Sequence, residues 1–129
     1  MSAMYDLGLE KYTKGQIDCV NNTIKARLGR ASAYTFSQAH EFASSLPAAI
    51  ATDVTLGSKV LSLGTLDVAD FVFAAVPAGA ACDRLWLFKF VTNDADSPLL
   101  AEITGFSVTP NGGDITMQPQ GTTPFLFKI

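Results

Sequence analysis

The sequence is poor in charged side chains and in the residues that most often carry catalysis. Only 16% of its 129 residues are charged, against about 25% in an average soluble chain, while 48% are hydrophobic. It has one histidine and two cysteines, and no Cys and His ligand set for zinc. Phosphate-cradling glycine loops, dinucleotide fingerprints and serine elbows are also missing. We therefore expect no enzymatic activity, no cofactor and no metal.

An enzymatic function would have to use the few remaining titratable residues. His40 would have to sit in a cleft with Cys19, Cys82 or a carboxylate, and nothing in the sequence brings them together. We interpret His40 as a surface or packing residue and the cysteines as free, buried thiols of a reducing compartment. Residues 93–97 place oxygen ligands at alternate positions, but they lack the glycine and bidentate glutamate of a calcium loop. Turn chemistry accounts for them.

Long apolar runs and strongly basic stripes are missing as well. No stretch approaches the roughly 20 apolar residues of a membrane span, and the N-terminus lacks a signal pattern. We expect a protein made in a cytoplasm, with no membrane and no nucleic acid among its partners. Residues 93–114 hold four acidic side chains and no Lys or Arg. This patch either faces a basic partner or consists of solvated turns.

What the sequence does contain is strand periodicity, most clearly in residues 84–92. Every second residue places Trp86, Phe88 and Phe90 on one face, and the opposite face is also mostly apolar. A strand that is apolar on both faces is typical of the middle of a sandwich or barrel. Residues 99–106 follow a turn rich in Asn, Asp, Ser and Pro. These two runs predict a central hairpin on which the other strands assemble.

Further short strands follow one another, bounded by glycine, proline and aspartate. The turn at 109–114 is predicted to join Phe106 to Ile115 as a hairpin. The spacing favours one all-β domain over residues 1–129, a β-sandwich or jelly-roll-like fold with a short N-terminal helix or arm and one short inserted helix. Besides the central hairpin, strands are expected at residues 23–28, 49–56, 59–63, 71–76, 114–117 and 125–129, the last with Phe125, Phe127 and Ile129 inward.

Two segments outside these strands carry the candidate contact residues. Residues 3–14 allow a short helix on which Tyr5, Leu9 and Tyr12 share a face, although Gly8 weakens it. This arm, residues 1–15, either packs on its own domain or lies on a neighbour. The alternation of residues 23–28 puts two basic side chains outward, as in a half-exposed or edge strand. The candidate residues for contact with neighbouring protein chains are therefore Tyr5, Leu9, Tyr12, Lys25 and Arg27.

The inserted helix is predicted between the strands, in the less regular first half of the chain. Thr35 and Gln38 have the spacing of a capping box. A helix over residues 37–46 would turn Phe42 and Leu46 inward.

The sequence contains a series of structural motifs: Tyr5-Asp6, the run Thr23-Ile24-Lys25-Ala26-Arg27-Leu28, Tyr34-Thr35, Ala39-His40-Glu41-Phe42, the run from Thr109 to Thr116, and Phe127-Lys128-Ile129. These motifs cover most of the chain and resemble those of small structural proteins of tailed bacteriophages. In that group the middle typically has an aspartate-rich stretch and a Tyr-rich strand, and residues 66–70 and 85–87 stand in their place here.

The resemblance implies a virion protein that decorates or cements the capsid by binding the major capsid protein, as a homotrimer on the capsid surface. Such a protein is assembled in the host bacterial cytoplasm. The composition agrees, since a small chain with so few charges can bury part of its apolar surplus against other protein. A monomer with an apolar surface is the simpler alternative. The alternative function is a phage tail or fibre-associated component that binds a host surface.

Overall fold

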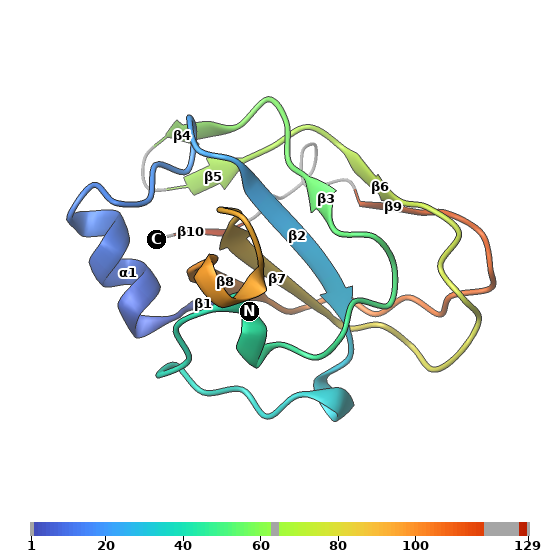
Figure 1. Ribbon diagram of the computed structural model, residues 1–129. Helices are drawn as coiled ribbons and strands as arrows, with labels where there is room; N and C mark the ends of the chain where they lie inside the picture. Colours follow the sequence, from blue (N-terminus) through green and yellow to red (C-terminus); the bar gives the residue numbers. More distant parts are fainter. Residues whose placement is uncertain (1, 63–64, 118–126, 129) are drawn as a thin grey trace.

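Strands β7 (Arg84–Lys89) and β8 (Leu99–Ile103) form a hairpin in the largest sheet of the computed structural model, which describes residues 2–62, 65–117 and 127–128 (Figure 1). The two strands pair antiparallel from Leu85 opposite Ile103 to Phe88 opposite Leu99. The predicted central hairpin is therefore confirmed. The sheet has the order β1-β8-β7-β2-β3, in which the other strands are β1 (Ser2–Met4), β2 (Ile24–Gly29) and β3 (Val54–Thr55).

Strand β7 contributes to a hydrophobic cluster on each face of this sheet, as its two apolar faces predicted. Leu85 and Leu87 belong to the large core, which includes residues of nearly every strand. Trp86 and Phe88 belong to a second cluster, called here the aromatic core, whose other buried members are Tyr5, Ala43, Leu46 and Leu99. All four of these β7 side chains are fully buried.

A β-bulge in β8 decides which of its side chains reach which core. The register shifts between Leu87 and Phe88, so that Leu87 faces Ala101 but Phe88 faces Leu99. Leu100 is the extra residue. Leu99 consequently packs in the aromatic core and Ala101 in the large core. Simple alternation would have placed both on one face.

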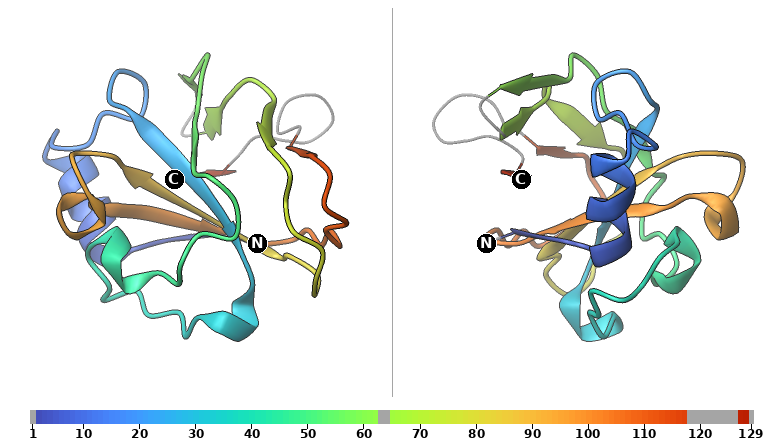
Figure 2. Two further views of the ribbon diagram at one scale, coloured as in Figure 1. Left: turned by 45° about the vertical axis from the view of Figure 1, so that its right-hand side comes forward. Right: turned by 90° about the vertical axis from the view of Figure 1, so that its left-hand side faces the viewer.

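The smaller sheets pack against the large-core side of the main sheet (Figure 2). One has the order β10-β5-β4, and in the other β6 pairs with β9. Across the residues that the structure describes, every strand pair is antiparallel and one short α-helix is present, so this is a β-rich domain. The bounds are β4 (Val60–Ser62), β5 (Thr65–Asp67), β6 (Phe71–Phe73), β9 (Ile115–Met117) and β10 (Phe127–Lys128).

Helix α1 (Asp6–Thr13) lies against β8 because Gly8 has no side chain. A Cβ atom at Gly8 would clash with the carbonyl oxygen of Leu99. The predicted N-terminal helix is therefore present, and the glycine that weakens it in isolation lets it approach the sheet closely. Before it, β1 pairs with β8, from Ser2 opposite Ile103 to Met4 opposite Ala101. This arm packs on its own domain, the first of the two alternatives.

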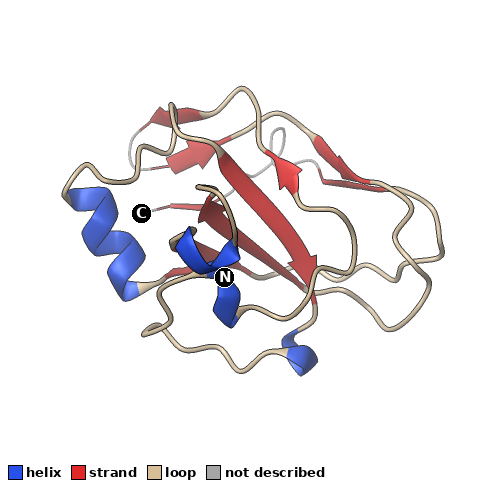
Figure 3. Cartoon of the chain, in the orientation of Figure 1, coloured by secondary structure: helices blue, strands red, loops and turns tan. Residues whose placement is uncertain are grey.

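The prediction of an inserted helix over residues 37–46 was wrong. Most of the segment is loop, and its only helical turn is the short 3-10 helix η2 (Ala43–Ser45) (Figure 3). Besides short-range turns such as His40 N to Ser37 O, its backbone bonds to distant residues: Asp6 N donates to Gln38 O, and Leu99 N donates to Glu41 O. The other 3-10 turns are η1 (Ala31–Ala33) and η3 (Asp94–Asp96).

Three strand predictions also need correction. Ile115 does not pair back toward Phe106, because β9 pairs with β6 while Val108 bridges to Cys82. Strand β2 is not at an edge, since it lies between β7 and β3. Strands β1 and β5 were not predicted. Of the predicted C-terminal strand, Phe125 and Ile129 lie outside the described residues, and nothing is described of the side chain of Phe127.

Candidate functional site

The three candidate contact residues of the N-terminal segment do not share a face. Tyr5 precedes α1 and is fully buried in the aromatic core. Tyr12 is half-buried against the large core, while Leu9 is 40% exposed. Of these three side chains, Leu9 is therefore the one most open to a partner. The contact role of all three stays a prediction.

A chain of polar side chains leads from the aromatic core toward the surface. The hydroxyls of Tyr5 and Tyr34 lie 3.0 Å apart, and the Tyr34 hydroxyl lies 2.6 Å from His40 Nδ1. Burial, followed by the hydrogen bond to Tyr34, raises the pKa of Tyr5 well above its usual range. Tyr5 is therefore a neutral hydroxyl at physiological pH. Through this contact His40 holds its own loop to Tyr34, which is the packing role expected for it.

Trp86 is fixed in the aromatic core by a second polar contact. Its Nε1 donates to Glu102 Oε2 at 2.9 Å, and Glu102 is itself only 7% exposed. Arg84 Nε lies 3.7 Å from the other carboxylate oxygen. The ring of Tyr34 meets Trp86 edge-on with centroids 5.2 Å apart. A buried carboxylate with these donors stabilises the hairpin and needs no catalytic explanation.

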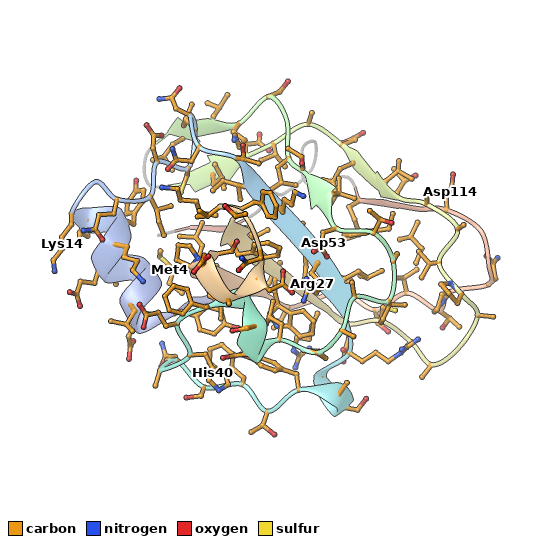
Figure 4. All side chains as sticks on the ribbon, in the orientation of Figure 1. Met4, Lys14, Arg27, His40, Asp53 and Asp114 are labelled. Atoms are coloured by element: carbon orange, nitrogen blue, oxygen red, sulfur yellow. The ribbon has the colours of Figure 1, made fainter. Side chains whose placement is uncertain are left out.

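Arg27 was predicted to face outward, and this was wrong. It is 5% exposed, and its guanidinium donates to both carboxylate oxygens of Asp53, at 2.9 and 2.8 Å, and to Asp94 at 3.0 Å (Figure 4). Nη1 also donates to the carbonyl of Pro47 at 3.2 Å. The hydrogen bonds to Asp53 are the main cause that raises the pKa of Arg27. The alternation of β2 was predicted correctly, but loops cover the face that was expected to be solvated.

Lys25 shares this face and is held by an aromatic ring. Its Nζ lies 3.8 Å from the centroid of the Phe90 ring, a cation–π contact. Its side chain is half-buried. The five candidate contact residues are therefore not brought together as one surface, and the contact roles of Lys25 and Arg27 also stay predictions.

The cysteines are free, buried thiols, as predicted. Burial raises the pKa of Cys19 to about 11 and also raises the pKa of Cys82, so neither is a ready nucleophile at neutral pH. Both pack in the large core, whereas Tyr34, the partner of His40, packs against the aromatic core. The geometry does not assemble a thiol dyad from these residues.

The loop before β8 forms a turn. Asn93 Oδ1 accepts the backbone N–H of Asp96 at 3.0 Å, which caps η3, and Asp94 is bound to Arg27. In the part of the chain that the structure describes, no group of three His, Cys, Asp or Glu side chains could hold a metal ion. Among the same residues, no helix has both the length and the apolarity needed to span a bilayer.

Sequence reasoning missed a hollow of about 520 Å³ on the surface. Residues 49–52 form one wall, and Ala74, Ala75 and Pro77 form the other. One wall precedes β3 and the other follows β6. Alanine-rich loops at these positions carry no motif. The one sequence feature that could have indicated a hollow was the number of small residues near two predicted strand ends.

Large apolar side chains remain exposed on strands at the edges of the small sheets. Val60 of β4 is 56% exposed and Val72 of β6 is 42% exposed. Within the described residues, β4 pairs only with β5 and β6 only with β9. Edge strands with exposed apolar side chains are suited to contact other protein.

No family model and no curated protein matches this chain. The fold and these contacts define a small antiparallel β-rich domain. Among its described residues, no buried side-chain nitrogen or oxygen lacks a hydrogen-bond partner, and Val60 and Val72 remain exposed on edge strands.

Proposed function

We propose that this protein is a structural component of a tailed-phage virion that decorates or cements the capsid by binding the major capsid protein as a homotrimer. The observation that carries the proposal is the exposure of Val60 and Val72 on edge strands. The resemblance of the sequence motifs to small phage structural proteins supports it from a different direction. On the virion, the protein would lie on the outer capsid surface.

The finer architecture belongs to the same proposal. The β10-β5-β4 and β6-β9 sheets share the large core with the main sheet, which supports a two-layer sandwich related to the jelly roll. A domain of this kind presents a fixed surface to its partners. Polar networks such as that of Arg27 hold the covering loops on the outer face of the main sheet.

The mechanism would be multivalent clamping. Each copy would make a modest contact with the shell, and a trimer would engage several capsid subunits at once. Because the protein would bind the assembled shell and not free subunits, it would stabilise the assembled state by mass action. No bond is made or broken, so such a role needs no catalytic group.

A host-binding tail or fibre protein is the alternative. An exposed aromatic cluster beside carboxylates would favour it. The large hydrophobic side chains exposed in the described residues are leucine and valines, so this observation does not support the alternative.

The proposal is tested by measuring the solution mass of the purified chain and its co-sedimentation with capsid shells that lack it. We expect a trimer that binds shells at a fixed, saturating stoichiometry. A double variant, Val60→Asp with Val72→Asp, should be monomeric because charges at the interface cost desolvation. The matched control, Ser32→Asp with Ser44→Asp, adds the same charge at exposed sites and should remain trimeric. A monomeric wild type that ignores shells would contradict the proposal.

A further inference from the structure

We propose that the hollow between residues 49–52 and 74–77 binds an extended segment of a partner protein, with a large apolar side chain beside a lysine or arginine. The inference rests on the proposed function in one respect, namely that the segment would belong to the major capsid protein. The chemistry of the segment follows from the lining of the hollow and the charges around it.

The hollow lies where two sheet edges approach each other, with no strand of the described residues between them. Strand β3 is an edge of the main sheet, and β6 pairs only with β9 among the described residues. The two strands lie side by side (Figure 1). Residues 49–52 lead into β3 and residues 74–77 leave β6, so the hollow continues the line of this seam. Partner segments commonly bind at such edges by adding a strand.

The walls offer space and main-chain groups. Four of the seven lining residues are alanine, and Thr52 is the only one with a polar side chain. A volume of about 520 Å³ lies within the range of about 300 to 1,000 Å³ that accommodates a ligand. Backbone groups of residues 49–52 make no hydrogen bond to other described residues. An extended segment could therefore bond to this wall and place a large apolar side chain over the alanines.

The charge around the hollow selects a basic segment. Asp53 directly follows one wall and shares Arg27 with Asp94, so this group carries one excess negative charge. Beside the other wall, Oδ1 of the exposed Asp114 accepts the backbone N–H of the lining residue Ala75 at 2.9 Å (Figure 4). Among the described residues, no Lys or Arg lines the hollow. Arg30 is bound on the adjoining loop, where its Nε donates to the carbonyl of Ala80 beyond the lining residue Pro77. Charge complementarity therefore favours a cation at the rim.

The backbone at Ala75 supports a binding role for this wall. Its φ angle is +48°, a left-handed conformation that is uncommon for a residue other than glycine. Asp114 holds the Ala75 N–H, and Val76 exchanges hydrogen bonds with Gly112 and Gly113. Strained positions held in this way concentrate at ligand-binding sites.

The first test uses a synthetic peptide, acetyl-Ser-Lys-Val-Phe-Val-Lys-Ser-amide, titrated into the isotopically labelled full chain and followed by NMR at low salt. We expect shift changes at residues 49–52 and 74–77. Twin peptides with glutamate for both lysines, or alanine for phenylalanine, should bind at least roughly tenfold more weakly, because each removes one complementary feature. Shift changes elsewhere, or equal binding of the three peptides, would overturn the inference.

Variants make the test specific to the hollow. Ala74→Trp should fill it and reduce binding about tenfold or more, whereas Ala78→Trp, exposed on the same loop outside the lining, should bind as the wild type does. Asp114→Asn keeps an oxygen acceptor for Ala75 but removes the charge, so binding should weaken at low salt and the difference should shrink at high salt. Asp6→Asn on α1 removes the same charge elsewhere and should have little effect. Thermal melting checks that each variant is folded.

Binding to capsid shells separates this inference from the proposed function. If Ala74→Trp binds shells as well as the wild type does, the hollow is not the contact, while the capsid role stands. If the wild type binds the basic peptide at the hollow but ignores shells, the capsid role is contradicted and the peptide chemistry of the hollow stands. Loss of shell binding by Ala74→Trp but not by Ala78→Trp would support both.

Discussion

Trp86 is the residue on which most contacts of the aromatic core converge. It is fully buried, its Nε1 donates to a buried carboxylate, and Tyr34 packs against its ring. The backbone opposite has to accommodate it, since a Cβ atom at Gly29 would clash with the indole ring. Both the size of the Trp86 side chain and its N–H donor are therefore required at this position.

Replacing Trp86 with alanine should lower the free energy of unfolding by about 3 to 5 kcal/mol, because it leaves a large cavity. Trp86→Phe should cost less, about 1 to 3 kcal/mol, mainly because Glu102 loses its donor. Urea denaturation measures both. The control Val91→Ala, at a side chain that is 49% exposed, should change stability by no more than about 0.5 kcal/mol. An unchanged midpoint for Trp86→Ala would place Trp86 outside the core.

The buried thiol of Cys19 makes the stability of the protein fall at alkaline pH. Its pKa rises from 9.0 to about 11 on folding, because burial disfavours the thiolate. A raised folded-state pKa contributes stability that is complete below pH 9 and is lost as the pH rises toward 11. We expect the melting temperature to fall across this window, and Cys19→Ala to reduce the slope. A pH-independent melting temperature for the wild type would contradict the burial of this thiol.

At the scale of elements, the N-terminal segment is joined to the hairpin through β1 and α1. Gly8→Ala should destabilise the protein, although alanine alone favours a helix by up to about 1 kcal/mol, because the added Cβ meets the Leu99 carbonyl. Leu9→Ala, at the partly exposed neighbouring position, is the matched control and should have a much smaller effect. Thermal melting compares them. A more stable Gly8→Ala protein would mean that α1 does not lie tightly on β8.

The strands were predictable where local pattern decides the structure, as in β7, whose two apolar faces announce a buried position. Other features depend on distant partners. The bulge at Leu100 reassigns a side chain to the other core, and residues 37–46 are kept from forming a helix by hydrogen bonds to Asp6 and Leu99. Alternation identified the face of Arg27 but not the loops that cover it.

The candidate site was less predictable than the fold. The hollow combines two alanine-rich loops that are separated in the sequence. The negative charge beside it comes from Asp53 and Asp114, whose positions in the sequence are typical of turn residues. The acidic run 93–114 indicated a basic partner or solvated turns. Its residues have different partners in the structure. Asp94 and Glu102 pair with arginines, and Asp114 accepts a hydrogen bond from Ala75 beside the hollow.

At the scale of the whole molecule, internal stability and the proposed external contacts use different parts of the chain. The two cores and their polar networks hold the main sheet and its covering loops together. The exposed Val60 and Val72 and the hollow lie on or beside strands at the edges of sheets. This division suits a protein that acts through surfaces shared with other chains.

The most direct measurement of the proposed capsid role is a cryo-electron microscopy map of capsid shells lacking this protein, before and after the purified chain is added. We expect new density on the outer surface, in groups of three at the local threefold positions, with a sheet edge and the hollow turned toward the shell. A map without added density, or with density confined to the tail, would contradict it.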